Sequence, residues 1–113
     1  MATSCLFCRI ASGEIPSTKV AESETAFAFR DIDPQAPSHI LVIPRVHVPS
    51  ISEVSDSSML GDLLAFAVSV AREEKLVEAG YRIVINNGRD GGQTVDHLHL
   101  HVLGDRHMTW PPG

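Results

Sequence analysis

Histidines alternate with aliphatic residues over positions 97–102, where the sequence is His-Leu-His-Leu-His-Val. Successive side chains of a strand point to opposite faces, so Leu98, Leu100 and Val102 are predicted to face the core. The three histidines then share the other face, at a spacing of about 6.7 Å along the strand. A purely structural strand would carry Thr, Ser, Lys or Glu there, so three imidazoles in register indicate a functional site. We call residues 97–101 the histidine segment.

Hydrophobic patterns predict the other elements. A helix of about 20 residues is expected to begin at Asp56 or Ser57 and to end before Gly80. Its buried face would consist of the residues at three- and four-residue spacing, which are Leu60, Leu63, Leu64, Ala67, Val68 and Ala71. Ser4 is expected to cap a short helix over residues 5–11. Strands are predicted at residues 19–21, 25–30, 38–43, 81–86 and 94–102.

These elements predict the α+β class, with residues 1–113 forming a single domain. The turns between consecutive strands are short, which favours antiparallel neighbours. We therefore expect a five-stranded antiparallel meander sheet with one long helix packed on it and one short N-terminal helix.

The charge balance excludes some partners. The chain has 9 Lys and Arg against 14 Asp and Glu, a formal net charge of −5, and its basic residues are scattered. Duplex nucleic acid is therefore not expected as a partner, although one small anion needs only a few donors. No apolar run approaches the roughly 20 residues of a membrane span, and no signal peptide is recognised. We expect a cytoplasmic protein with no membrane partner.

Two chemistries could use the histidine segment. In one, a neutral imidazole attacks phosphorus while a hydrogen bond to its other nitrogen holds the ring, and a neighbouring protonated histidine stabilises phosphoryl oxygens or protonates the leaving group. In the other, several of the histidines bind a catalytic zinc, as three-histidine sites do. The spacing alone permits both.

The loop before the histidine segment favours a phosphate ligand. Its paired glycines, Gly91 and Gly92, let main-chain N–H groups approach an anion closely. Asn86, Gln93 and Thr94 add side-chain donors. A plain hairpin loop is the alternative for this composition, but beside three histidines the phosphate-binding interpretation gains.

Five segments resemble the histidine-triad (HIT) family, specifically its Hint branch of nucleoside phosphoramidate hydrolases. They are FAFRDI at 27–32, PQAPSHILVIP at 34–44, DGGQT at 90–94, the histidine segment, and WPPG at 110–113. The resemblance implies a HIT-like fold and cleavage of the P–N bond in purine nucleoside 5'-phosphoramidates. His99 would attack the α-phosphorus, a covalent nucleotidyl-histidine would form, and water would release the nucleoside monophosphate.

The resemblance also implies roles for individual residues. His101 would contact phosphoryl oxygens and help the leaving group, His39 would support the site, and the backbone of His97 would orient the ring of His99. Asp31 would accept the ribose hydroxyls. The phosphate would be held by Asn86, Gly92, Gln93 and Thr94. The purine base would lie between Leu6, Phe7, Ile10, Phe29, Ile32 and Leu41, for each of which simple core packing is the alternative.

Cys5 and Cys8 stand one helical turn apart, so both sulfurs can face one metal. A reducing cytosol favours a metal pair or a redox pair over a structural disulfide, and two thiols without metal are a further alternative. Relatives with this pair resemble a zinc site of two cysteines and two histidines, which implies His47 and His97 as the other ligands. A closed site has no open position, so this zinc would be structural and no metal would act in catalysis.

Trp110, beside two prolines, would be an exposed apolar side chain prone to association unless it packs against another surface. It packs either on its own domain or, as the Hint branch implies, toward the partner subunit's active site in a homodimer built through the long helix and the fourth strand. Three functions therefore remain to be compared. They are a phosphoramidate hydrolase, a zinc metallohydrolase that uses the histidine segment as ligands, and a nucleotide-sensing regulatory module with incidental hydrolysis.

Overall fold

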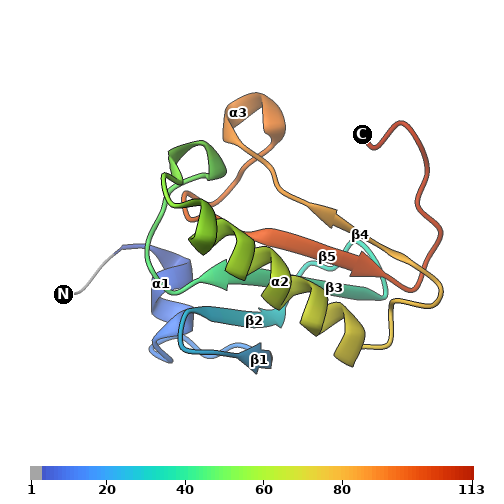
Figure 1. Cartoon of the computed structure of the whole chain (residues 1–113), viewed down its shortest axis with the longest axis horizontal. Coiled ribbons are helices and arrows are strands. Elements are labelled where there is room, and N and C mark those ends of the chain that lie inside the picture. Colours follow the sequence, from blue (N-terminus) through green and yellow to red (C-terminus); the bar gives the residue numbers. More distant parts are fainter. Residues whose placement is uncertain (1–3) are drawn as a thin grey trace.

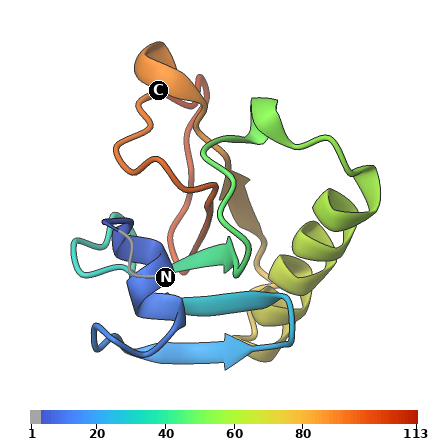
Figure 2. The same ribbon diagram turned by 90° about the vertical axis from the view of Figure 1, so that its left-hand side faces the viewer.

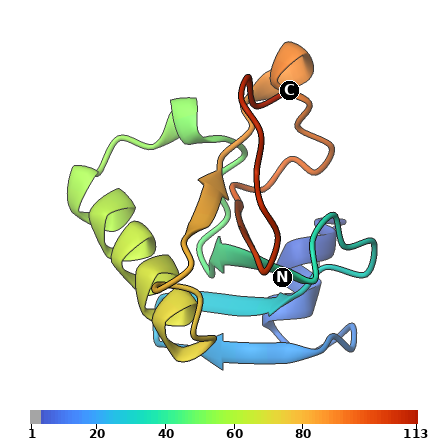
Figure 3. The ribbon, with the colours of Figure 1, turned by 90° about the vertical axis from the view of Figure 1, so that its right-hand side faces the viewer.

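The computed structural model describes residues 4–113 and has the expected α+β architecture (Figure 1). A five-stranded antiparallel sheet is formed by β1 (Lys19–Glu22), β2 (Ala26–Arg30), β3 (Ser38–Pro44), β4 (Tyr81–Val84) and β5 (Leu100–Gly104). Two longer helices, α1 (Leu6–Ala11) and α2 (Ser57–Glu73), lie on opposite sides of this sheet (Figures 2 and 3). Two single turns complete the fold, the 3-10 turn η1 (Ile51–Glu53) and α3 (Gly88–Gly91).

The strand order β1-β2-β3-β5-β4 corrects the predicted meander. Only β1 to β3 follow one another across the sheet, because the chain then crosses through α2 to the far edge. It forms β4 there, and β5 returns between β3 and β4. Four of the five β5 residues are buried, whereas every residue of β4 is half-buried, so the more apolar strand takes the interior position.

The sheet is covered on both faces, and alternation along the strands decides which residue meets which helix. Ala28, Ile40 and Val42 belong to the core cluster that packs on α2. Their neighbours Phe29, Leu41 and Ile43 pack instead against Phe7 and Ile10 of α1. Leu98, Leu100 and Val102 lie in the α2 cluster as predicted, which turns the three histidines toward the α1 face.

The long helix is shorter than the sequence pattern suggests. Asp56 caps it by accepting hydrogen bonds from the N–H groups of Ser58 and Met59. It ends at Glu73, and Lys75 adopts a left-handed φ of 62°, so Gly80 belongs to the following loop and does not cap the helix. Among the six residues predicted for its buried face, Leu63, Ala67 and Ala71 are buried, and Val70 joins them.

Two predicted boundaries near the site were wrong. The short helix α1 is capped by Cys5, whose Sγ accepts from the Cys8 N–H at 3.3 Å, and not by Ser4. The last strand begins at Leu100 and not at residue 94, so His97 and His99 precede it. The N–H of Leu98 donates to the Val48 carbonyl at 2.7 Å, which draws this part of the chain onto the loop after β3. No helix of the described residues has the length and apolarity needed to cross a membrane.

Candidate active site and metal centre

His99 is almost fully buried, with 5% of its surface exposed, and lies on the α1 face of the sheet. Its Nδ1 is 2.7 Å from the main-chain oxygen of His97. A carbonyl oxygen can only accept, so Nδ1 must carry the proton and Nε2 must carry the lone pair. The Phe7 ring stands edge-on to the imidazole, with centroids 5.1 Å apart, and holds it in place. The hydrogen bond expected from the resemblance is therefore present.

His39 and His101 form a second pair of rings beside His99. His39 Nε2 lies 2.9 Å from His101 Nδ1 and 3.4 Å from Asp31 Oδ2. The Nδ1 of His39 accepts from the Gln35 N–H at 2.9 Å. The Nε2 of His101 is buried and has no hydrogen-bond partner in the part of the chain that the structure describes. An unpaired buried nitrogen of this kind is costly, and a bound ligand would remove the cost.

Burial favours the neutral forms of His39 and His101. It lowers the pKa of His101 to about 4, with the charges of His99 and His39 acting in the same direction. Burial also lowers the pKa of His39, although Asp31 and Asp33 oppose the shift. Neutral rings offer lone pairs and N–H groups at neutral pH, which is the state that nucleophilic attack requires.

A pocket of about 300 Å³ opens between α1 and the sheet, and His99 and His101 line it. Asp31, Thr94 and all six residues predicted to hold a purine base line the same pocket, namely Leu6, Phe7, Ile10, Phe29, Ile32 and Leu41. Ile32 is fully exposed at this site. Five further lining residues were not predicted from the sequence, namely Ile15, Pro16 and Ser17 in the segment after α1, Arg30 of β2, and Val95 before the histidine segment.

The predicted phosphate loop contributes less to this pocket than expected. Of its four predicted residues only Thr94 lines the pocket. The Gln93 amide is engaged within the loop, since Oε1 accepts from the Gly88 N–H and Nε2 donates to the carbonyls of Pro49 and Val95. Gly92 has a left-handed φ of 81° and ends α3. Gln93 therefore holds the loop in shape, and Asn86 and Gly92 lie outside the pocket lining.

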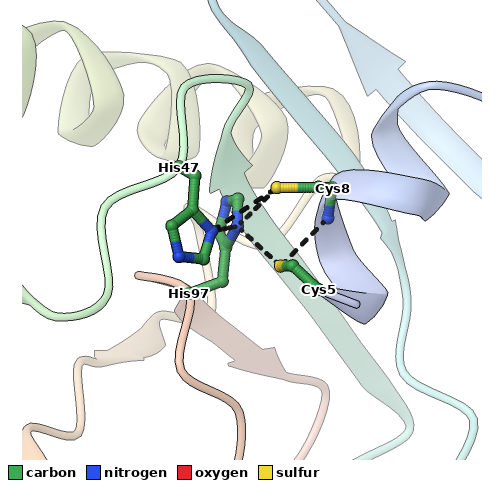
Figure 4. A group of neighbouring side chains, drawn as sticks. All are labelled: Cys5, Cys8, His47 and His97. Carbon is green, nitrogen blue, oxygen red and sulfur yellow. Dashed lines mark hydrogen bonds between the residues drawn. The ribbon is translucent and has the colours of Figure 1, made fainter. Parts of the chain in front are cut away.

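Cys5, Cys8, His47 and His97 converge on one point between α1, the loop after β3 and the histidine segment (Figure 4). The Nδ1 atoms of the two histidines are 3.2 Å apart, and Nδ1 of His97 is 3.2 Å and 3.5 Å from the two sulfurs. Tetrahedral zinc with ordinary bond lengths has edges of about 3.3 Å between nitrogens and about 3.5 Å between nitrogen and sulfur. The four donors therefore fit a closed zinc site, and the cysteines form no disulfide.

The orientation of His97 supports the same assignment. Its Nε2 lies 2.9 Å from the Pro44 carbonyl oxygen, which accepts the ring proton and leaves the lone pair on Nδ1, the atom that faces the cluster. Burial, with the hydrogen bond and charge of Cys5, raises the pKa of Cys8 to about 11. A thiol in this position stays protonated unless a cation supplies the missing charge.

The three histidines of the histidine segment do not converge on a common ion. His97 Nδ1 faces the cysteines, His99 Nδ1 faces the His97 carbonyl, and His101 Nδ1 faces His39. Asp31, His39 and His101 do bring three ligand atoms within 4.8 Å. The separation of 2.9 Å between the two rings is a hydrogen-bond length, and Nδ1 of His39 is already occupied, so this group is a hydrogen-bonded network.

The tail after β5 leaves Trp110 exposed over 81% of its surface. The Arg82 guanidinium lies 5.9 Å from the centre of the indole ring, and it donates to the Thr109 carbonyl. Burial of Trp110 against its own domain, one of the two alternatives considered from the sequence, is therefore not what the structure shows. The ring remains available to a partner.

Comparison with known proteins agrees with this geometry. The chain is 50% identical over 112 residues to a 14 kDa zinc-binding protein of Zea mays, covering 96% of this chain and 87% of that protein. Its fold matches a HIT family hydrolase from Legionella pneumophila with a TM-score of 0.94 and 54% identity, over 97% of this chain and 100% of that one. A histidine triad protein from Clostridium difficile matches with a TM-score of 0.91 and 40% identity, over 96% of both chains. The model of the HIT domain matches residues 12–108, and the chain belongs to this family.

Proposed function

We propose that the protein hydrolyses purine nucleoside 5'-phosphoramidates at the P–N bond through a covalent nucleotidyl-histidine. The observation that carries the proposal is the unprotonated Nε2 of His99, whose ring lines the pocket and is oriented by the hydrogen bond from its Nδ1–H to the His97 carbonyl. The hydrolase from Legionella pneumophila, to which the chain is similar over its whole length, supports the reaction class.

In the proposed reaction the base lies between the apolar residues of the pocket and Asp31 accepts the ribose hydroxyls. Nε2 of His99 attacks the α-phosphorus, the P–N bond of the substrate breaks, and the leaving nitrogen takes up a proton from water and departs as the neutral amine. The His97 carbonyl stabilises the positive charge that develops on the His99 ring once Nε2 carries phosphorus. In this proposal the Nε2–H of His101, which has no partner within the described chain, donates to the phosphoryl oxygens. Water then cleaves the bond between phosphorus and His99, which releases the monophosphate.

A zinc ion bound by Cys5, Cys8, His47 and His97 would supply a structural crosslink and no catalytic centre. The four ligands come from α1, the loop after β3 and the histidine segment. The zinc ion would hold α1 over the pocket and would fix the position of His97, whose carbonyl orients the ring of His99. The zinc-binding relative from Zea mays supports this assignment.

We further propose that the chain is a single cytoplasmic domain that forms a homodimer through α2 and β4. β4 pairs on one side only among the described strands, and the partly buried residues of that edge are compatible with a twofold continuation of the sheet. Trp110, exposed next to this edge, would then reach the partner subunit's active site. Sedimentation equilibrium of the full chain tests the assembly, because a monomer at micromolar concentration contradicts it.

The test of the reaction uses adenosine and guanosine 5'-phosphoramidates as substrates. His99→Ala is expected to abolish release of the monophosphate while nucleotide binding, measured by calorimetry, persists. His107→Ala changes an exposed histidine of the tail and is the matched control. Mass spectrometry of the wild-type protein, quenched during turnover, should place the nucleotidyl group on His99. Full activity of His99→Ala would refute the mechanism, and tight binding without turnover by the wild type would favour a nucleotide-sensing module.

A further inference from the structure

The two rings next to His99 are linked to a main-chain amide that lies outside the pocket. The N–H of Gln35, in the loop between β2 and β3, points at Nδ1 of His39 across 2.9 Å. A main-chain N–H can only donate, so the lone pair of His39 must lie on Nδ1 and the ring proton on Nε2. In this loop the identity of the Gln35 side chain is immaterial to the contact, because the donor belongs to the backbone.

The same logic fixes the next ring. Since Nε2 of His39 carries the proton, it donates to Nδ1 of His101, and that nitrogen must accept. The proton of neutral His101 is then confined to Nε2, the buried nitrogen without a partner in the described chain. His99 has the opposite tautomer, with its proton on Nδ1. The two neighbouring rings, both of which line the pocket, therefore carry opposite tautomers.

Gln35 is itself held by a residue that is distant in sequence. Nε of Arg106 donates to the Gln35 carbonyl at 3.0 Å, and Nη1 donates to the His107 carbonyl at 3.2 Å. Arg106 lies in the bend directly after β5, where Asp105 adopts a left-handed φ of 67°. The Gln35 side chain adds a local bond to the Asp33 carbonyl. These contacts tie the loop between β2 and β3 to the segment that follows β5.

We infer that the Gln35 main-chain N–H, positioned by Arg106, fixes the tautomers of His39 and His101 so that His101 presents Nε2–H to the bound phosphoryl group. Arg106 is thus a positioning residue, and its effect on turnover rests on the proposed function. A second proton on His101 would need His39 to accept at Nε2 and to carry its own proton on Nδ1, against the Gln35 N–H. The arrangement therefore selects a neutral hydrogen-bond donor at His101, which agrees with the strong effect of burial at this ring.

Asp31 is the alternative cause of the same tautomer. Its Oδ2 lies 3.4 Å from Nε2 of His39 and also favours a proton there. Its Oδ1 accepts from the Asp33 N–H at 2.8 Å, so the carboxylate is partly engaged in the turn. The amide contact is shorter, and a fixed dipole on the backbone does not depend on a side-chain rotamer. An experiment must therefore separate the Gln35 amide from the Asp31 carboxylate.

The direct test is nitrogen-15 NMR of the histidine rings in the ligand-free full-length protein, which reports the tautomer of each ring without any assay of turnover. The wild type should show protons on Nε2 of His39 and His101 and on Nδ1 of His99. Replacing residue 35 by the corresponding α-hydroxy acid exchanges its N–H for oxygen and keeps the side chain. That ester protein should show His39 and His101 shifting toward the Nδ1–H form. Asp31→Asn should keep the wild-type tautomers.

Arg106→Ala is the second variant and keeps the amide itself intact. We expect kcat for an adenosine phosphoramidate to fall about tenfold with little change in KM, since one hydrogen bond of this kind is lost. Arg106→Lys, which can still donate to the Gln35 carbonyl, should recover part of the loss. Arg72→Ala, at an exposed position of α2, is the matched control and should retain full activity.

The inference is overturned if the ester protein keeps both wild-type tautomers, if Asp31→Asn alone reverses them, or if Arg106→Ala turns over like the wild type. Failure of the proposed function would give a different result. NMR would then show the predicted tautomers of His39, His99 and His101, while the wild type would release no monophosphate from any phosphoramidate. Hydrolysis by a protein whose rings carry other tautomers would refute the inference and leave the reaction standing.

Discussion

Replacement of His101 by glutamine should make the protein less sensitive to acid. The wild-type ring is half-buried, and this burial lowers its pKa to about 4 from its ordinary value of 6.5. The unfolded chain exposes this ring and protonates it at its ordinary pKa. Between the two values the unfolded state binds more protons than the folded state, so stability falls as the pH falls through this window. Glutamine cannot titrate and removes this contribution.

The magnitude follows from the two pKa values. At pH 7 both states are mostly neutral, and the contribution of His101 to the pH dependence is small. At pH 4.5 the unfolded ring is almost fully charged while the folded ring is still mainly neutral, which costs the native state on the order of 2 kcal/mol. His39 and His97 also have lowered pKa values, from burial in both cases, and add to the acid sensitivity of the wild type and the variant alike.

Urea denaturation at pH 7 and at pH 4.5 measures this difference. The free energy of unfolding of the wild type should fall by on the order of 2 kcal/mol more than that of His101→Gln between the two conditions. Loss of zinc in acid affects both proteins and cancels in the comparison. His107→Gln, at an exposed position of the tail, should behave as the wild type does. Equal losses for the wild type and His101→Gln would refute the idea of a buried neutral ring.

Two other predictions concern the metal centre and the core. Cys8→Ser should lose bound zinc in elemental analysis and lower the thermal unfolding midpoint, because one of the four proposed ligands is gone. Hydrolysis should persist in the folded protein, because no metal contacts the reacting atoms in the proposed mechanism. A rate of hydrolysis that falls in proportion to the zinc content would instead indicate zinc-dependent chemistry. Leu100→Ala truncates a fully buried side chain of β5 and should cost about 3 kcal/mol in chemical denaturation. Leu64→Ala, on the exposed side of α2, should cost much less, and similar losses would contradict the assigned core.

The sheet shows which structural predictions sequence alone supports. The alternation of residues 97–102 placed Leu98, Leu100 and Val102 in the core correctly, because a period of two needs only an extended backbone. The predicted start of the last strand at residue 94 was wrong, because a residue joins a strand only where a neighbouring strand lies opposite its main chain. The Leu98 N–H meets the Val48 carbonyl and not a neighbouring strand. The order of β4 and β5 was missed for the same reason, because short-range patterns do not encode which of two strands lies at the edge.

The candidate site divides in the same way. Residue types and the family resemblance identified the histidines, the cysteine pair and the apolar residues that line the pocket. The groups that orient them are mostly main-chain atoms, namely the carbonyls of Pro44 and His97 and the amide of Gln35. Every residue except proline carries both of these groups, so no sequence pattern distinguishes the few that meet an imidazole.

The sequence by itself predicted imidazoles on one side of an extended segment and a pair of thiols, one helical turn apart, that can face one metal. Only the tertiary structure decided that His97 faces the thiols, that His99 keeps its lone pair on Nε2 and that His101 keeps a proton there. The physical reason lies in the imidazole ring. Each neutral ring is one donor and one acceptor, and the partner that folding brings to one nitrogen fixes what the other nitrogen can do.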